Sequence, residues 1–403
     1  MSCNRYYARW VLPITSPPIK DGWVEIVDGM VSAIGASRPV GFPDPSGVDL
    51  GDSVIMPGVV NAHTHLELSG LHGRIPRATS MPSWARAVMD ERPNVASSLA
   101  GRVPYAASEC RRCGTALVGD IANTLDSLDT LRTECIDATL FHEFLGFDIE
   151  AADADNLVEP VSRQITERLN GRVQIRAAAH APYSVSAELF CAIGRLPGPR
   201  SVHLAESEEE VEFLLSGGGP WRDILEERGR MSRAWVPPQL RPVDYLESVG
   251  WLRDDTIAVH GVQLVGDEIN RLAQARTTLV VCPRSNDWTG AGVPAISEFY
   301  IRGLRVAIGT DSLASAPDLN VFKEMSEVRR LAPDVPAAQL LESATIVGAQ
   351  ALGRGRSHGA IEPGRQAALI AVEIPTGISD VEEYLLSGIE PCSITWLEEI
   401  AAS

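Results

Sequence analysis

The chain has 403 residues, 45 % of them hydrophobic, so it can form a large buried core. Its 53 acidic residues outnumber 35 lysines and arginines, and the resulting formal charge of −18 opposes binding to nucleic acid or anionic membranes. No apolar run approaches the roughly 18 residues of a membrane span, and the N-terminus lacks the order of a signal peptide. We therefore expect a cytoplasmic enzyme that acts on a small molecule.

The two ends of the chain have the character of short strands and turns. Near the N-terminus, Asp28-Gly29 separates two β-like runs, which is a strong hairpin signal. Near the C-terminus, the run AALIAVEI returns to the same character. We expect residues 1–56 and 353–403 to form one small β-sandwich domain built from both chain termini.

Between residues 57 and 352, short β-branched runs alternate with longer helical stretches, a pattern typical of parallel strands joined by helices. Eight such runs predict an α/β fold, a catalytic (β/α)8 TIM barrel. Segment 206–229 is predicted to be helical, and the Gly- and Pro-rich interval 217–250 to be a loop or lid over the barrel mouth. The predicted strands are 58–65, 115–121, 138–146, 173–180, 201–206, 256–262, 277–283 and 304–311.

Histidines and a carboxylate gather where these strands end, on the face where such barrels carry their working residues. His63 and His65 are two apart on the first strand, so both side chains point to the same side. His203 lies near the end of the fifth strand, and Asp311 ends the eighth. Three histidines and one carboxylate, with a position left for water, suit zinc or ferrous iron. We predict these four residues as ligands of one divalent metal ion, zinc in preference to iron.

Two further residues at strand ends are predicted to be catalytic. Glu206 lies where the fifth strand gives way to a helix, and a carboxyl there can face a metal-bound water and carry protons. An acidic residue can instead simply favour a helix N-terminus, a role that we assign to Glu208, Glu209 and Glu210. His260, on the sixth strand, is expected to hydrogen-bond the hydroxide that the metal generates, while Asp311 accepts a proton.

These residues resemble the motifs of the amidohydrolase superfamily, in its deaminase branch: HTH on strand one, HLAE on strand five, a lone histidine on strand six and GTDS on strand eight. The resemblance implies one metal ion, a glutamate that carries protons to the ring nitrogen and to ammonia, and a strand-six histidine that orients the hydroxide. Members with two metal ions carry a modified lysine or a glutamate on strand three or four. Here strand four ends in His180, and Glu143 is the one carboxylate that could support a second metal ion.

Two shorter segments imply the substrate. HAPYS, after strand four, resembles a segment of the S-adenosylhomocysteine, methylthioadenosine and adenosine deaminases, and this likeness makes His180 a substrate contact. NAHTHLELS and CPRSN resemble aminodeoxyfutalosine deaminases of menaquinone biosynthesis, which convert a 6-amino purine to the 6-oxo form. Their substrate carries a benzoate, for which we predict Arg284 as the cationic contact, with Arg74, Arg77 and Arg176 as rivals. Glu67 is predicted to bind ribose hydroxyls or, alternatively, to accept a hydrogen bond from a ligand histidine.

The expected activity is hydrolytic deamination of an adenine-type nucleoside, with 6-aminodeoxyfutalosine as the first choice. Deamination of S-adenosylhomocysteine, methylthioadenosine or adenosine is the nearest alternative. Hydrolysis of a ring amide or of a triazine at the same single-metal site is another, and a catalytically silent scaffold is a third. Besides the small-molecule substrate, a second copy of the chain in a homodimer remains an open alternative as a partner.

Overall fold

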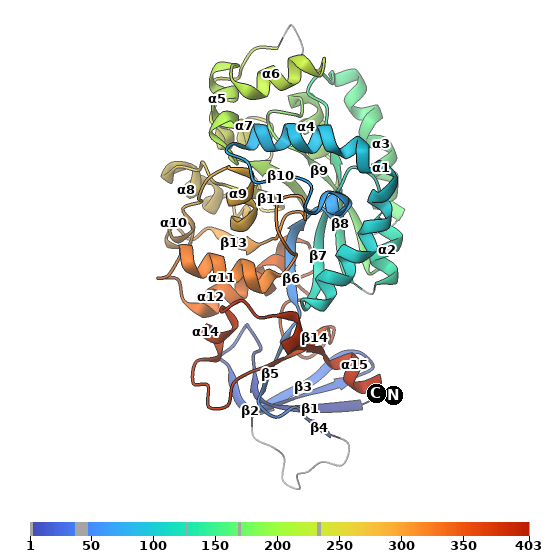
Figure 1. Cartoon of the computed structure of the whole chain (residues 1–403), viewed down its shortest axis with the longest axis vertical. Helices are drawn as coiled ribbons and strands as arrows, with labels where there is room; N and C mark the ends of the chain where they lie inside the picture. The colour runs from blue at the N-terminus through green and yellow to red at the C-terminus, as the bar shows by residue number, and fades with distance from the viewer. Residues whose placement is uncertain are drawn as a thin grey trace.

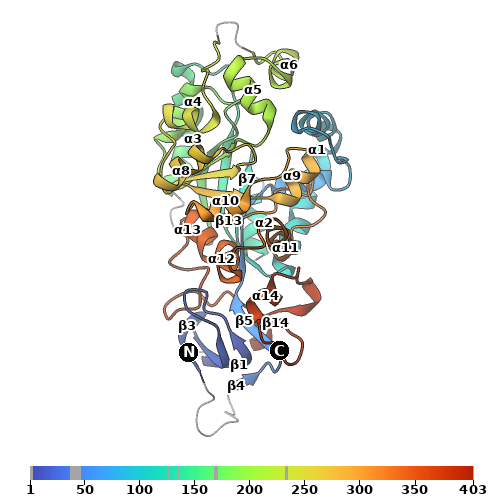
Figure 2. The ribbon, with the colours of Figure 1, turned by 90° about the vertical axis from the view of Figure 1, so that its left-hand side faces the viewer.

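The computed structural model describes two parts of unequal size that lie along the long axis of the molecule (Figures 1 and 2). A barrel occupies the larger part, and helices α5 and α6 lie at its far end. A smaller sheet, to which both ends of the chain contribute, lies at the opposite end. The residues described are 3–36, 47–125, 127–134, 136–167, 171–231 and 235–402.

Eight parallel strands form the barrel in the order of the sequence, as predicted. The ring closes through a parallel bridge between Thr64 and Asp311, which joins the ends of the first and last strands. Most of the strands are buried along their whole length, which explains their apolar, β-branched composition. The strands are β6 (Val59–Thr64), β7 (Thr115–Ala122), β8 (Asp137–Phe144), β9 (Val173–Ala179), β10 (Arg200–Leu204), β11 (Thr256–His260), β12 (Thr278–Val281) and β13 (Arg305–Ile308).

Helices connect the strands and cover the barrel (Figure 1). None of the helices in the described ranges combines the length and the hydrophobicity that crossing a bilayer requires. They are α1 (Met81–Arg112), α2 (Ser127–Thr133), α3 (Ala151–Glu167), α4 (Ala187–Gly194), α5 (Glu208–Ser216), α6 (Pro220–Glu227), α7 (Pro242–Ser248), α8 (Gly266–Gln274), α9 (Pro283–Thr289), α10 (Ile296–Ile301), α11 (Val321–Leu331), α12 (Ala337–Glu342) and α13 (Gly348–Ala351), with the 3-10 turn η1 (Leu66–Leu71) after β6 and the π-helical turn η2 (Ser343–Val347) before α13.

The interval 217–250 is more ordered than the predicted loop. The predicted helix 206–229 is broken at Gly217, whose positive φ of 73° ends α5, and Pro220 then starts α6. Helix α7 follows in the same interval, and residues 232–234 lie outside the described ranges. This segment therefore contributes helices, and α6 contributes side chains to the main cavity of the barrel.

The smaller part is one hydrogen-bonded mixed sheet to which both chain ends contribute. The predicted hairpin is present: β2 and β3 pair antiparallel up to Val27 and Met30, and Asp28 and Gly29 between them have φ of 50° and 76°. The C-terminal β14 pairs antiparallel with β5, so distant segments share one ladder. The strands are β1 (Cys3–Val11), β2 (Ile19–Val27), β3 (Met30–Ala36), β4 (Gly47–Asp49), β5 (Ser53–Pro57), β14 (Leu369–Glu373) and β15 (Ile394–Trp396), accompanied by α14 (Val381–Leu385), η3 (Pro391–Ser393) and α15 (Leu397–Ala402).

A single residue, Gly58, joins the last N-terminal strand of this sheet to the first strand of the barrel. A Cβ added at Gly58 would lie 2.7 Å from the Cβ of Ala116 and 2.9 Å from the ring of Trp396, so only glycine fits. Apolar contacts also cross the junction, because Val54 and Met56 of β5 belong to the same buried cluster as residues of the barrel. The two parts therefore pack as one body around the start of β6.

Candidate active site

The two histidines of the first barrel strand lie where β6 ends. His63 has no exposed surface, and neither of its ring nitrogens has a hydrogen-bond partner among the described residues. Burial, reinforced by the neighbouring His65, lowers the pKa of His63 well below its usual value, so the ring is neutral. Burying an imidazole whose two nitrogens have no partner costs free energy, unless a metal ion accepts the lone pair of the ring.

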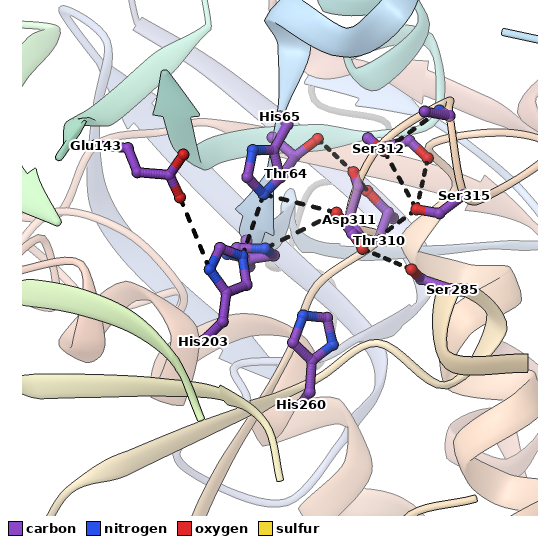
Figure 3. A network of polar contacts seen from close by, with 12 residues as sticks. Thr64, His65, Glu143, His203, His260, Ser285, Thr310, Asp311, Ser312 and Ser315 are labelled. Carbon is purple, nitrogen blue, oxygen red and sulfur yellow. Dashed lines mark hydrogen bonds and ion pairs between the residues drawn. The ribbon is translucent and has the colours of Figure 1, made fainter. Parts of the chain in front are cut away.

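Two groups that could hold a metal ion share His63, one with His65 and Asp311 and the other with His203 and His260, and the ligand atoms of each group lie within 4.8 Å of one another (Figure 3). Asp311 Oδ1 lies 3.9 Å from His63 Nε2 and 3.7 Å from His65 Nε2, and His65 Nε2 lies 3.4 Å from His203 Nε2. His203 Nδ1 donates to the carbonyl of His180 at 2.8 Å, so its Nε2 carries the lone pair and turns it toward the cluster. These donor atoms suit one divalent cation of the zinc type.

Backbone geometry at the barrel seam fixes this arrangement. The amides of Thr310 and Asp311 both donate to the carbonyl of His63, at 3.1 and 3.0 Å. A Cβ on Gly309 would lie within 2.9 Å of backbone and Cβ atoms of His63, so glycine is required there. Ala205, His260 and Asp311 have positive φ values of 50°, 77° and 57°. Left-handed residues at three strand ends carry backbone strain, of the kind that concentrates at functional sites.

Glu206 and His260 face each other beside the cluster. His260 Nε2 lies 3.5 Å from Glu206 Oε1, and Asn286 Oδ1 contacts His260 Nδ1 at 3.1 Å and so orients the ring. Glu206 is only 2 % exposed, and burial raises its pKa to about 7, although His260 acts in the opposite direction. A carboxyl with this pKa can both hold and release a proton near neutral pH.

Asp311 has the opposite electrostatic character. Burial alone would raise its pKa, but His65 and His63 outweigh burial and hold it below the usual value. Ser285 and Ser315 donate hydrogen bonds to Asp311 Oδ2 at 2.5 and 3.2 Å. The two carboxyl groups therefore differ: Asp311 is ionised, whereas Glu206 titrates near neutrality.

Glu210 departs from the simple role predicted for the acidic run at the start of α5. Glu208 and Glu209 reach solvent, but Glu210 is fully buried and accepts hydrogen bonds from the amides of Ala205 and Glu206, at 3.0 and 2.9 Å. Burial raises the pKa of Glu210 to about 8. Its side chain thus holds the strand-to-helix turn that carries Glu206.

A cavity of about 470 Å³ opens above the cluster. His180 lies in its wall, where burial lowers the pKa of the ring to about 4 and Ser184 Oγ lies 2.6 Å from Nδ1, so a neutral imidazole faces the cavity. The rings of Tyr183 and Trp221 stack at 3.9 Å with an interplanar angle of 13°. Apolar side chains from the helices line much of the rest: Met81, Trp84, Val88 and Met89 from α1, and Trp221, Ile224 and Leu225 from α6.

Residues 54–390 match the amidohydrolase family, which is most of the chain. The chain belongs to the amidohydrolase family. It is 31 % identical over 314 residues to an aminodeoxyfutalosine deaminase of Deinococcus radiodurans, covering 75 % of this chain and 74 % of the relative. It is 28 % identical over 386 residues to a 5-methylthioadenosine/S-adenosylhomocysteine deaminase of Moorella thermoacetica, covering 90 % and 84 %. A zinc-bound adenosine deaminase structure from Xanthomonas campestris superposes with a TM-score of 0.78 at 25 % identity, covering 97 % of this chain and 90 % of that one.

Two predicted substrate contacts of this amidohydrolase do not line the cavity. Arg284 is held by Glu324 and Asp318, with its Nε 2.7 Å from Glu324 Oε1 and a terminal nitrogen 2.8 Å from Asp318 Oδ1. Two carboxylates of the chain thus already balance the charge of Arg284, and its predicted contact with a substrate carboxylate stays a prediction. The rival residues Arg74, Arg77 and Arg176 do not line the cavity either.

Glu67 likewise lies outside the cavity lining. Its carboxylate accepts hydrogen bonds from the backbone amides of Asn123 and Thr124, each at 3.0 Å, and from the Thr124 hydroxyl. It therefore fixes the turn after β7, and its predicted contact with ribose or with a ligand histidine stays a prediction.

Sequence reasoning missed several residues that the amidohydrolase fold brings to the cavity. Arg92 of α1 lines it, and so do Arg228 and Arg230 at the end of α6. No spacing in the sequence indicates which exposed helical arginines turn toward a barrel mouth. Ser285 and Asn286, by contrast, belong to the CPRSN segment, in which the sequence predicts a role for Arg284 alone. The first turn of α9 directs Arg284 toward α11 and its two neighbours toward the cluster.

Proposed function

We propose that this amidohydrolase is a metal-dependent deaminase of adenine-type nucleosides, with 6-aminodeoxyfutalosine as its preferred substrate and a role in menaquinone biosynthesis. The observation that carries the proposal is the pairing of Glu206 with His260 beside a cluster of three histidines and one aspartate. Named relatives that act on aminodeoxyfutalosine, methylthioadenosine and S-adenosylhomocysteine support the same substrate class.

We assign His63, His65, His203 and Asp311 as ligands of one divalent ion, zinc in preference to iron. The unpartnered nitrogens of His63 and the inward Nε2 of His203 fit such an ion. An ion held there lowers the pKa of a bound water to about 7 and so supplies hydroxide at neutral pH.

The protein groups account for the protons of the reaction. Deamination adds water at C6 of the purine and releases ammonia, so one proton of that water finishes on N1 and the other on ammonia. Glu206, with a pKa of about 7, is suited to deliver a proton to N1 and then to the leaving amine. Asp311 is ionised and can accept a proton first. His260 gives its Nδ1 hydrogen to Asn286 Oδ1, so its Nε2 faces the reaction and, when the ring is protonated, can donate a hydrogen bond to the oxygen that develops at C6.

The cavity supports a nucleoside with a bulky 5′ substituent that ends in an anion. Its apolar helical side chains and the Tyr183–Trp221 stack suit an aromatic group, and three arginines line it further out, Arg92, Arg228 and Arg230. A guanidinium is a favourable partner for a carboxylate. An arene carboxylate attached through C5′ combines both features, and aminodeoxyfutalosine has this chemistry.

A substrate panel tests the proposal. Purified, zinc-loaded protein is incubated with aminodeoxyfutalosine, S-adenosylhomocysteine, 5′-methylthioadenosine, 5′-deoxyadenosine and adenosine. A chlorotriazine is included to represent the alternative substrate class. Ammonia release and the absorbance change from 6-amino to 6-oxo purine are followed. The expected result is the highest kcat/KM with aminodeoxyfutalosine. Turnover of the triazine alone would replace the proposed reaction, and no ammonia from any nucleoside would remove it.

A further inference from the structure

Glu143 is a buried carboxylate beside the cluster with no role in the proposed chemistry. It lies at the end of β8, is 6 % exposed, and lines the cavity. Its Oε2 accepts a hydrogen bond from Asn123 Nδ2 at 2.8 Å. Within the described ranges, its Oε1 accepts none. A buried carboxylate oxygen without a donor costs free energy that a hydrogen-bonding ligand would recover.

A second cation is a poor candidate for that ligand. The nearest polar ring atom is His203 Nδ1, at 3.7 Å from Glu143 Oε1. That nitrogen already donates its hydrogen to the carbonyl of His180, so it has no lone pair for a second metal ion. Glu143, His180 and His203 each offer one ligand atom within 4.8 Å of the others, and His180 uses only its Nδ1 for Ser184. The one lone pair of His203, however, is on Nε2, which lies 3.4 Å from His65 Nε2 in the first cluster. The free oxygen therefore calls for a neutral donor such as a hydroxyl group.

We propose that Glu143 accepts hydrogen bonds from the ribose hydroxyls of the substrate. This inference rests on the proposed nucleoside deamination. An adenine nucleoside offers two sets of donors, the 6-amino group and the sugar hydroxyls. The amino group must meet Glu206 and His260, and Figure 3 shows Glu143 and His260 on opposite sides of His203. The sugar hydroxyls are the donors that remain on the Glu143 side.

The surroundings of Glu143 agree with a sugar that continues into a 5′ substituent. Asn123, which donates to Glu143, accepts a hydrogen bond from an Arg92 terminal nitrogen at 2.9 Å. Arg92 is one of the arginines that line the outer cavity. The side-chain amide of Asn123 thus links Glu143, which would hold the hydroxyls, to Arg92, which lies near the substituent. The carboxylate of Glu143 would repel an anionic tail, which separates the two subsites by charge.

The test compares substrates that differ only in the sugar. The same 5′-substituted adenine is offered as the riboside, the 2′-deoxyriboside and the 3′-deoxyriboside to the wild type, Glu143→Gln and Glu143→Ala. Loss of a hydrogen bond to a charged acceptor predicts a riboside KM roughly ten-fold or more higher in Glu143→Ala, with kcat within a few-fold. The KM for each deoxyriboside, which keeps only one of the two hydroxyls, should rise less, so the preference for the riboside narrows. Glu143→Gln keeps the shape of the side chain and one acceptor oxygen, so its riboside KM should lie between those of the wild type and Glu143→Ala.

Three outcomes would overturn the inference. Equal rises of KM for riboside and deoxyribosides would show a general disturbance of the cavity. Retained preference in Glu143→Ala would show that another group reads the hydroxyls. A fall in bound metal in Glu143→Gln, measured by elemental analysis, would make Glu143 a metal ligand. Failure of the wild type to deaminate any nucleoside removes the proposed function itself, and is thereby distinguished from failure of the variants to change sugar preference.

Discussion

The cavity has two parts that differ in origin and in character. We call the first the floor, formed by side chains at strand ends: His63, His65, His203, Glu206, His260 and Asp311. We call the second the wall, formed by α1 and α6 with Trp84, Trp221, Arg228 and Arg230. The floor is almost sealed, with His63 fully buried and Glu206 2 % exposed. In the wall, the side chains of Arg228 and Arg230 are 46 % and 66 % exposed.

This difference indicates how chemistry and selectivity are divided. In the floor, burial lowers the pKa of His63 and raises that of Glu206, and backbone hydrogen bonds across the barrel seam hold the strand ends together. The wall relies on packing and on ion pairs at the surface, such as Arg228 with Asp90 at 2.8 Å and Arg86 with Glu227. Changes to the floor should therefore abolish turnover, whereas changes to the wall should alter which nucleoside is preferred.

Removal of the metal ion should have the largest effect. The floor contains a buried histidine whose ring nitrogens need a ligand, and the proposed reaction needs hydroxide at neutral pH. Treatment with a chelator should lower ammonia release to background, and added Zn²⁺ should restore it. The chelated protein should also have a lower Tm, because a ligand that binds only the folded state stabilises it. Full activity after verified metal removal would contradict the assignment of the floor.

The substitution Glu206→Gln should have the second largest effect on turnover. Glutamine keeps the size of the side chain but cannot carry a proton, so kcat should fall by roughly 10²- to 10⁴-fold with little change in bound metal. Steady-state kinetics and elemental analysis of the same preparation measure both quantities. A variant with near-normal kcat would exclude Glu206 as the proton carrier, and a variant that loses its metal would make it a ligand.

The same substitution should change how stability depends on pH in metal-free protein. The pKa of Glu206 is about 7 in the folded state, against 4.5 ordinarily, so the folded state keeps a proton that the unfolded state releases between these values. Stability contributed by this group is therefore lost as pH rises from 4.5 to 7, by up to about 3 kcal/mol. Relative to the wild type, Glu206→Gln should gain stability over this window. Urea unfolding at pH 5 and pH 8 measures the difference, and parallel pH dependences of the two proteins would refute it.

Changes to the wall should give the smallest effect and act on one substrate class. Replacing Arg228 and Arg230 together by Met should raise KM for a carboxylate-bearing nucleoside roughly ten-fold and leave that for adenosine within about two-fold. Arg222→Met is the matched control, because Arg222 lies on α6 but bonds Glu226 and Gly217 and does not line the cavity. An equal rise of KM for both substrates would indicate that α6 has moved and that no carboxylate is read there.

The floor could be predicted from the sequence because of how a parallel barrel is built. The C-terminal ends of eight parallel strands meet at one edge of a barrel, so His63, His203 and Asp311 lie at that edge whatever the intervening segments do. The wall could not be predicted in this way, since the side chains that it turns inward depend on how α1 and α6 pack. Arg284 illustrates the limit: it directly follows a strand, yet its side chain turns to Glu324 and Asp318.

Two local features of the structure also could not be predicted from the residue types alone. An acidic run at a helix start does not distinguish Glu210, buried under the turn that carries Glu206, from its two solvent-facing neighbours. The break between α5 and α6 depended on a left-handed glycine, whose φ no pattern specifies in advance. Both features belong to tertiary packing, which decides among conformations that the local sequence allows.

The one-residue link at Gly58 bears on how this enzyme can be altered. Because β5 runs into β6 through this residue, His63 lies only six positions from a strand that the C-terminal β14 also pairs with. A trimmed barrel that started at residue 57 would leave β6, the strand that carries His63, without the neighbouring strands that hold its N-terminal end. Variants of this enzyme with new helices around the cavity should therefore keep the N- and C-terminal strands of the smaller sheet, because these strands hold the start of β6.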